Sequence, residues 1–188
     1  TLFPYTTLFR SPWGQVGPLV SSVGGYLAYM EKHARLWEKQ ALLKARAIAG
    51  NIDMGAEVLE RIAPALYQAS PDIVRADVLR SKQRIEEQLR AQGQEWGEVK
   101  LGQGSIRDVE FVTQYLQLAH GDVYPEVRSH NTLDALMRLA ACRLLAPEDY
   151  RVLADGYTFL RPVEHYLQMM DYRQTHLLPG DRRELAYL

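Results

Sequence analysis

The sequence predicts an all-α fold, a single bundle of about six helices. Apolar residues recur at intervals of three and four almost throughout the chain, which is the period of an amphipathic helix. No segment sustains the apolar and polar alternation of a half-buried strand. Residues that favour helix starts and helix ends separate the periodic segments, so the helices can be assigned in order along the chain.

The two predicted helices nearest the amino terminus carry long apolar stripes. The first runs over about 23–49 and stops at Gly50 with Asn51, residues that commonly end a helix. The second runs over about 54–69, where Pro64 lies inside the helix and is expected to kink it. The residues expected inward are Val23, Tyr26, Met30, Ala34, Trp37, Ala41 and Ile48 in the first, and Val58, Leu59, Ile62 and Leu66 in the second.

The third and fourth predicted helices flank a glycine-bearing loop. The third runs over about 71–93, with Ser70 as its cap and a proline at its first position. The fourth starts at Ser105, whose hydroxyl, with the Asp108 carboxylate three residues on, fits a capping box, and it ends at Gly121. The expected buried residues are Val74, Val78, Ile85 and Leu89, then Ile106, Val109, Val112, Leu116 and Ala119.

The fifth and sixth predicted helices complete the bundle. Asn131 opens the fifth, and Pro147 begins the sixth, the longest of the set. Pro162 is expected to bend the sixth helix because it removes a backbone donor in mid-helix. The residues expected inward are Leu133, Leu136, Met137, Ala140 and Leu144, then Tyr150, Leu153, Tyr157, Leu160, Val163, Leu167 and Met170.

Composition excludes several functional classes. The 188 residues carry 22 basic and 23 acidic side chains for a net charge of -1, so we expect neither a nucleic-acid partner nor a membrane partner. No apolar run is long enough to span a bilayer. Cys142 is the only cysteine, which excludes an internal disulfide and fits a reducing cytoplasm, where we expect the protein to be located.

The first eleven residues, TLFPYTTLFRS, are interpreted as an assembly scar. A common sequencing adapter translates to them residue for residue, and they lack the basic start and clean apolar run of a secretory signal. The alternative is a natural disordered arm. We therefore expect residues 12–188 to form one helical domain, truncated at both ends.

The stretch VKLGQGSIRDVEFVTQYL is the most unusual in the chain. A helix amino terminus presents free backbone donors and a partial positive charge, so Lys100 and Arg107 beside it would suit a phosphate. Asp108 and Glu110 diverge on the helix and are not expected to pair with each other. The alternative is a capped helix whose Arg107 and Asp108 form surface ion pairs.

Two further stretches carry charged residues of interest. In LWEKQALLKARAIAG, Lys44 ends an apolar stripe and would either snorkel to solvent or reach an anion, with Arg46 to one side. In FLRPVEHYLQMMDYRQTHLLP, neighbours Glu164 and His165 point apart on a helix, and the spacing to His176 matches no zinc motif. Structural histidines are the favoured interpretation there. No Walker loop and no nucleophile elbow occurs.

Together these stretches resemble one family, the bacterial bifunctional glutamine synthetase adenylyltransferase/adenylyl-removing enzymes. The resemblance rests on GPLV, WEKQALLKARAIAG, RIEEQL, KLGQGSIRDVEF, NTLDAL, LRPVEHYLQ and QTHLLP, in this order and spacing. Members are built as two halves, each a polymerase-beta-type nucleotidyltransferase domain followed by a helical domain. One half attaches AMP to a tyrosine of glutamine synthetase with ATP, and the other removes it by phosphorolysis.

The resemblance implies the helical domain of the deadenylylating half, within a magnesium-dependent, ATP-using transferase of nitrogen regulation. Lys44, Arg46, Lys100 and Arg107 would then face the nucleotide or phosphate, and Asp108 and Glu110 would orient those cations or contact a metal-bound water. No catalytic residue and no metal ligand is expected in this chain, because the family's metal carboxylates lie upstream. The chain alone is therefore expected to be inactive.

The resemblance also implies partners and leaves alternatives. The implied partners are glutamine synthetase, the PII signalling protein and the upstream nucleotidyltransferase domain of the same chain. One alternative is a non-catalytic helical module that docks glutamine synthetase or PII. Another is a relative of PII uridylyltransferase, which shares the arrangement of a nucleotidyltransferase and a helical domain, although WEKQALLKAR and QTHLLP favour the adenylyltransferase.

Overall fold

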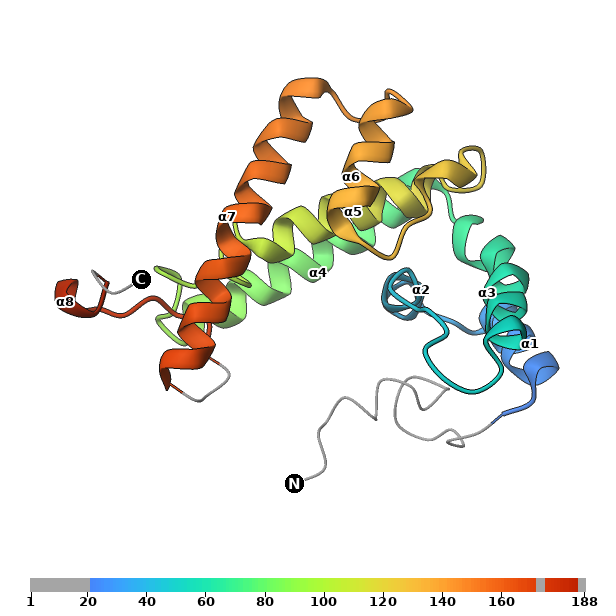
Figure 1. Cartoon of the computed structure of the whole chain (residues 1–188), viewed down its shortest axis with the longest axis horizontal. Helices are drawn as coiled ribbons and strands as arrows, with labels where there is room; N and C mark the ends of the chain where they lie inside the picture. The colour runs from blue at the N-terminus through green and yellow to red at the C-terminus, as the bar shows by residue number, and fades with distance from the viewer. Residues whose placement is uncertain (1–20, 172–174, 186–188) are drawn as a thin grey trace.

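The structure, a computed structural model, describes residues 21–171 and 175–185 (Figure 1). Within this part of the chain the prediction of an all-α fold is confirmed: the regular elements are helices, and β-type pairing is limited to an isolated bridge between Glu98 and Leu177. The proposed scar at residues 1–11 lies outside the described residues.

The single helix predicted over 23–49 is wrong, because the chain breaks it twice. Helix α1 (Val23–Lys32) ends at His33, and α2 (Leu36–Leu42) then begins in a new direction. Glu38 causes the restart: its carboxylate accepts the backbone N–H of Arg35 at 2.9 Å and the hydroxyl of Tyr29 at 2.6 Å. After α2 the chain is a loop, so Ile48 is 78% exposed rather than buried.

Asn51 begins a helix instead of ending one. Its side chain accepts the backbone N–H of Met54 at 3.0 Å and caps α3 (Ile52–Tyr67). Helix α4 (Pro71–Ala91) follows, and both helices agree with the predicted segments to within about two residues at each end. Ser70 occupies the N-cap position of α4, but its side chain makes no capping hydrogen bond to the described residues.

Helix α5 (Ile106–His120) lies along α4 and also contacts α3, α6 and α7. The capping box predicted for its start forms differently. The Ser105 hydroxyl donates to the backbone carbonyl of Lys100 at 2.7 Å, and the Asp108 carboxylate accepts the N–H of Gly104 at 2.8 Å. The side chains therefore tie the preceding loop onto the first turn of α5.

Helices α6 (Thr132–Ala141) and α7 (Pro147–Asp171) form a hairpin across α5, as Figure 1 shows. The 3-10 helix η2 (Pro125–Val127) precedes them, and α8 (Arg182–Leu185) comes last. Asn131 caps α6 as predicted, accepting the N–H of Asp134 at 3.1 Å. The predicted buried face of α6 is partly wrong, since Leu133 and Met137 are exposed. On α7, Met170 is exposed and Leu167 is buried.

The apolar core has two parts that share α5. The first gathers residues of α1, the loop after α2, α3, α4 and α5, and the second gathers residues of α5, η2, α6 and the turn into α7. Helix α5 supplies Leu118 to the first and Val109 to the second. The fully enclosed side chains include Met30, Ile62, Val74, Ile106, Leu118, Val127, Leu136 and Leu139.

Candidate functional site

The loop before α5 fixes the position of Lys100. The Glu98 carboxylate accepts the backbone N–H groups of Lys100 and Leu101 at 2.9 and 3.1 Å. The Lys100 carbonyl in turn accepts the N–H of Arg107 at 2.9 Å, besides the Ser105 hydroxyl. This short set of bonds holds Lys100 against the first turn of α5, so Lys100 and Arg107 lie at the same end of that helix.

Glu164 on α7 is the buried centre of this region. Its side chain is 4% exposed, and both of its oxygens meet nitrogen atoms. Lys100 Nζ lies 3.1 Å from Oε1, and the Arg161 guanidinium lies 2.5 Å from Oε2. His176 Nδ1 lies 3.5 Å from Oε1. Three chain segments therefore converge on one carboxylate: the loop before α5, α7, and the segment after α7.

Arg107 lies beside the second carboxylate of this region. Its Nε is 3.7 Å from Glu110 Oε2, too long for a hydrogen bond, and its guanidinium lies over the Phe111 ring at 5.6 Å from the centroid. The Nε atom is buried and has no hydrogen-bond partner among the described residues. Glu110 also accepts the Tyr157 hydroxyl at 3.5 Å. We call Lys100, Arg107, Glu110, Arg161, Glu164 and His176 the cationic cluster.

His176 is surrounded by charges of both signs. Burial lowers its pKa below the ordinary value, and the nearby cations Lys100 and Arg107 lower it further, while Glu98 and Glu164 act in the opposite direction. The neutral imidazole is therefore favoured near neutral pH. Three permanent cations, Lys100, Arg107 and Arg161, then lie with the carboxylates of Glu110, Glu164 and Glu98, so the charges of the region balance. The Lys100 and Arg107 side chains are 29% and 34% exposed, which leaves two partly exposed cations suited to an anion.

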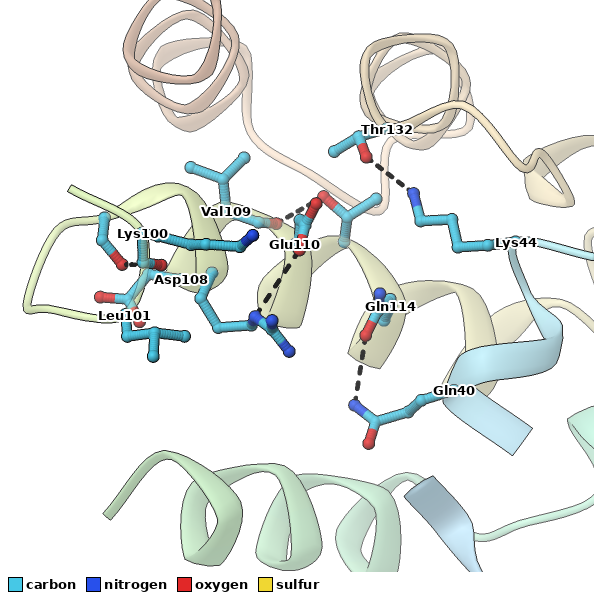
Figure 2. Close-up of polar contacts among 12 residues, drawn as sticks. Gln40, Lys44, Lys100, Leu101, Asp108, Val109, Glu110, Gln114 and Thr132 are labelled. Carbon is cyan, nitrogen blue, oxygen red and sulfur yellow. Dashed lines mark hydrogen bonds and ion pairs between the residues drawn. The ribbon is translucent and has the colours of Figure 1, made fainter. Parts of the chain in front are cut away.

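Lys44 forms a separate polar contact between the turn after α2 and the start of α6. Its ammonium group donates to the Thr132 hydroxyl at 2.7 Å (Figure 2). Burial lowers the pKa of Lys44, and attraction to Glu110 partly offsets that effect. Next to it, Gln40 donates to Gln114 of α5 at 3.4 Å. Glu110 therefore links Lys44 electrostatically to the cationic cluster.

Arg46 and Asp108 lie apart from the other residues singled out in the sequence. Arg46 is exposed in the loop between α2 and α3. Asp108 faces α4, where it forms an ion pair with Lys82, and Lys82 also pairs with Glu86 at 3.2 Å. Of the two carboxylates expected to orient the cations, the structure thus places Glu110 beside Arg107 and places Asp108 on another face of α5.

Sequence reasoning missed Glu164 and His176 as members of this region. Glu164 was available from the sequence, since it interrupts the apolar face of α7 between Leu160 and Leu167 and has Arg161 one turn before it. A carboxylate on a buried face requires partners. His176 gave no such signal, because only the backbone pairing of residues 97–99 with 176–178 brings it to Glu164.

A groove of about 360 Å³ opens near the Lys44 loop, between α3 and the start of α6. Arg128 forms one wall, where its guanidinium lies 4.6 Å from the centroid of the Tyr67 ring and its Nε donates to the Gly121 carbonyl at 2.8 Å. Arg138, also in the wall, pairs with Asp134 at 2.8 Å. Its arginines therefore already have partners, in contrast to Arg107 Nε.

Comparison with known proteins identifies relatives along the whole chain. The family model described as GlnD PII-uridylyltransferase matches residues 77–187, and the one described as glutamate-ammonia ligase adenylyltransferase matches residues 8–61. A protein of Streptomyces avermitilis, described as a bifunctional glutamine synthetase adenylyltransferase/adenylyl-removing enzyme, is 43% identical over 98% of the chain. Proteins of the same description from Streptomyces coelicolor and Nocardia farcinica are 40% and 41% identical over 94% and 92% of the chain.

The chain spans only 17–18% of the length of these relatives. Among the described residues, no helix is both long and apolar enough to cross a membrane. The same part of the chain holds no grouping of three or more histidine, cysteine, aspartate or glutamate side chains that could bind a metal ion.

Proposed function

Because the chain belongs to the family of bacterial bifunctional glutamine synthetase adenylyltransferase/adenylyl-removing enzymes, with residues 77–187 matching the GlnD PII-uridylyltransferase family, we propose that it forms the helical domain of the deadenylylating half of such an enzyme. The domain comprises residues 12–188 and lies in the cytoplasm. It acts together with a nucleotidyltransferase domain of the same protein.

The proposed reaction is phosphorolysis of the bond between AMP and a tyrosine of glutamine synthetase. An oxygen of inorganic phosphate forms a bond to the α-phosphorus, the bond from phosphorus to the tyrosyl oxygen breaks, and the phosphate proton passes to that oxygen, which yields ADP and free tyrosine. Two anions must meet in this reaction, so fixed cations lower the electrostatic cost of bringing them together.

One observation carries the proposal: Lys100 and Arg107 are two cationic side chains at the same end of α5, they are 29% and 34% exposed, and the Arg107 Nε has no hydrogen-bond partner among the described residues. A phosphate would accept hydrogen bonds from the exposed part of the Arg107 guanidinium, and Lys100 lies at the same end of α5 to contact the same anion. More distant parts of the nucleotide would be contacted by Lys44 and Arg46. Lys44 is linked to the cationic cluster electrostatically through Glu110, and Arg46 is exposed.

Magnesium and ATP are proposed for the enzyme as a whole and not for this cluster. Both Glu164 oxygens already meet cationic groups, and Glu110 faces Arg107, so these residues do not fit a divalent metal. The metal carboxylates that the resemblance implies belong to the nucleotidyltransferase domain. The cluster would contribute charge and positioning from the helical side.

The test uses the complete reading frame that contains this chain. Lys100→Met and Arg107→Ala are each introduced, and ADP formation from adenylylated glutamine synthetase is measured against phosphate concentration. Each variant should lower kcat/KM for phosphate at least about tenfold, since a hydrogen bond to a charged group contributes roughly 1.5–3 kcal/mol. Arg151→Ala, an exposed arginine of α7, is the matched control. Unchanged kcat/KM in folded variants would contradict the proposal.

A second candidate is a uridylyltransferase that acts on PII, because the GlnD PII-uridylyltransferase match covers more than half of the chain. The same purified protein is therefore assayed for UMP transfer to and from PII. Activity on PII, with none on glutamine synthetase, would favour the second candidate. Binding of glutamine synthetase or PII with neither activity would favour a docking module.

A further inference from the structure

Glu164 meets more nitrogen-bearing side chains than Glu110, the other carboxylate of the cationic cluster. Its side chain is 4% exposed, and it is approached by Lys100, Arg161 and His176 from the loop before α5, from its own helix and from the segment after α7. An ionised carboxylate is costly to bury unless its oxygens are paired. Lys100 and Arg161 provide that pairing, one on each carboxylate oxygen, so the position of the Lys100 ammonium group depends on Glu164. His176 Nδ1 lies 3.5 Å away without a hydrogen bond to the described residues.

Lys100 is the partner whose position matters most for an anion. A lysine side chain has a flexible four-carbon stem, and ordering it costs conformational entropy. Its backbone is fixed by Glu98 and Arg107, and its ammonium group is fixed by Glu164 at 3.1 Å, which leaves the side chain 29% exposed. An ammonium carries three donors, so Lys100 can keep Glu164 and still donate to an anion.

We propose that Glu164 is the positioning residue of the anion site: it holds the Lys100 ammonium at the end of α5, next to Arg107, ready to contact phosphate. This inference rests on the proposed function. Arg161 completes the pairing of Glu164, and the backbone bonds of His176 and Leu178 hold the segment after α7 beside the site. Glu164 itself does not contact the phosphate.

The two possible roles of Glu164, positioning Lys100 or contributing only its negative charge, predict opposite changes in phosphate affinity when Glu164 is replaced by a neutral residue. A carboxylate near a phosphate site repels the phosphate, so a neutral replacement should improve phosphate binding if Glu164 contributes charge alone. If Glu164 positions Lys100, the neutral replacement frees the lysine and weakens phosphate binding. The direction of the change therefore separates the two roles.

The experiment compares Glu164→Gln and Glu164→Asp with the matched control Glu148→Gln in the complete protein. Glu148 is exposed in the first turn of the same helix, so its replacement removes one carboxylate charge without touching the cluster. KM for inorganic phosphate should rise on the order of tenfold in Glu164→Gln. KM for phosphate should also rise in Glu164→Asp, because the shorter side chain keeps the negative charge but moves the carboxylate away from Lys100 by the length of one methylene group. The control should leave KM unchanged.

Several outcomes would overturn the inference while the proposed function stands. If Lys100→Met raises KM but Glu164→Gln lowers it or leaves it unchanged, Glu164 does not position Lys100. If Glu164→Gln fails to fold, the Asp variant decides, and an unaltered KM there also overturns the inference. If neither Lys100→Met nor Arg107→Ala changes phosphate dependence, the proposed function fails and the inference falls with it.

Discussion

At the scale of single residues, buried polar side chains join the segments of this protein. Gln117 on α5 is 1% exposed, and its amide nitrogen donates to the carbonyls of Val127 and Ser129 at 2.9 and 2.8 Å. Lys39 donates to the Ala65 carbonyl at 2.5 Å, and so ties α2 to α3. Each of these side chains donates to backbone carbonyls of a neighbouring segment and so joins two parts of the chain.

The burial of His176 predicts a pH dependence of stability. Its pKa is lowered in the folded chain, so the unfolded state binds a proton more readily once the pH falls below about 6.5, the ordinary value. The contribution of His176 to stability is therefore complete above that pH and is lost as the pH falls toward the folded pKa. Urea unfolding at pH 7.5 and 5.5 should show a larger loss of unfolding free energy in the wild type than in His176→Asn.

The control for this prediction is His165→Asn, which removes an exposed histidine of α7. This variant should keep the pH dependence of the wild type. If His176→Asn keeps it too, the imidazole of His176 is not the group responsible.

At the scale of helices, capping side chains mark the starts of α2, α3 and α6, and packing determines which face is buried. Asn51 and Asn131 each accept a backbone N–H three residues on, and Glu38 restarts the chain as α2. In α6 the buried face is Thr132, Ala135, Leu136 and Leu139. The predicted stripe differed from this face because apolar residues cover most of the circumference of α6, except the side of Asp134 and Arg138. Periodicity alone therefore does not fix the rotation of the helix.

The rotation of α6 can be tested with two neighbouring substitutions. Leu136 is 0% exposed and Met137 is 52% exposed. Leu136→Ala should lower the unfolding free energy by about 2–5 kcal/mol because it leaves a cavity in the core. Met137→Ala should change it by no more than about 0.5 kcal/mol, as is usual for surface positions. Urea unfolding measures both, and equal losses would contradict the assigned face.

At the scale of the whole molecule, α5 unites the two parts of the core. The α6–α7 hairpin packs across α5, α4 packs along it, and α3 contacts it (Figure 1). Leu118 of α5 packs in the first part of the core, and Val109 of α5 packs in the second part. Loss of packing in either part would therefore expose one face of α5. The first turn of the same helix carries Arg107 and receives the Lys100 loop, so the candidate site depends on both parts.

This arrangement predicts one cooperative unfolding transition for the chain. Leu118→Ala in the first part and Leu139→Ala in the second should both shift the same transition to lower denaturant, by about 2–5 kcal/mol each. Far-UV circular dichroism and tryptophan fluorescence should report coincident midpoints in each variant. Two separate transitions, with only one of them affected by each substitution, would show that the two parts unfold independently.

The sequence by itself determined the all-α class, the positions of α3 to α7 and the residues that cap α6, because local propensity and capping depend on near neighbours. It also placed Lys100 and Arg107 together at the start of α5. Only the tertiary structure decided the break between α1 and α2, the inward face of α6, and the meeting of Glu164 with His176 and Lys100. These features depend on contacts between residues far apart in the chain, which a local pattern does not encode.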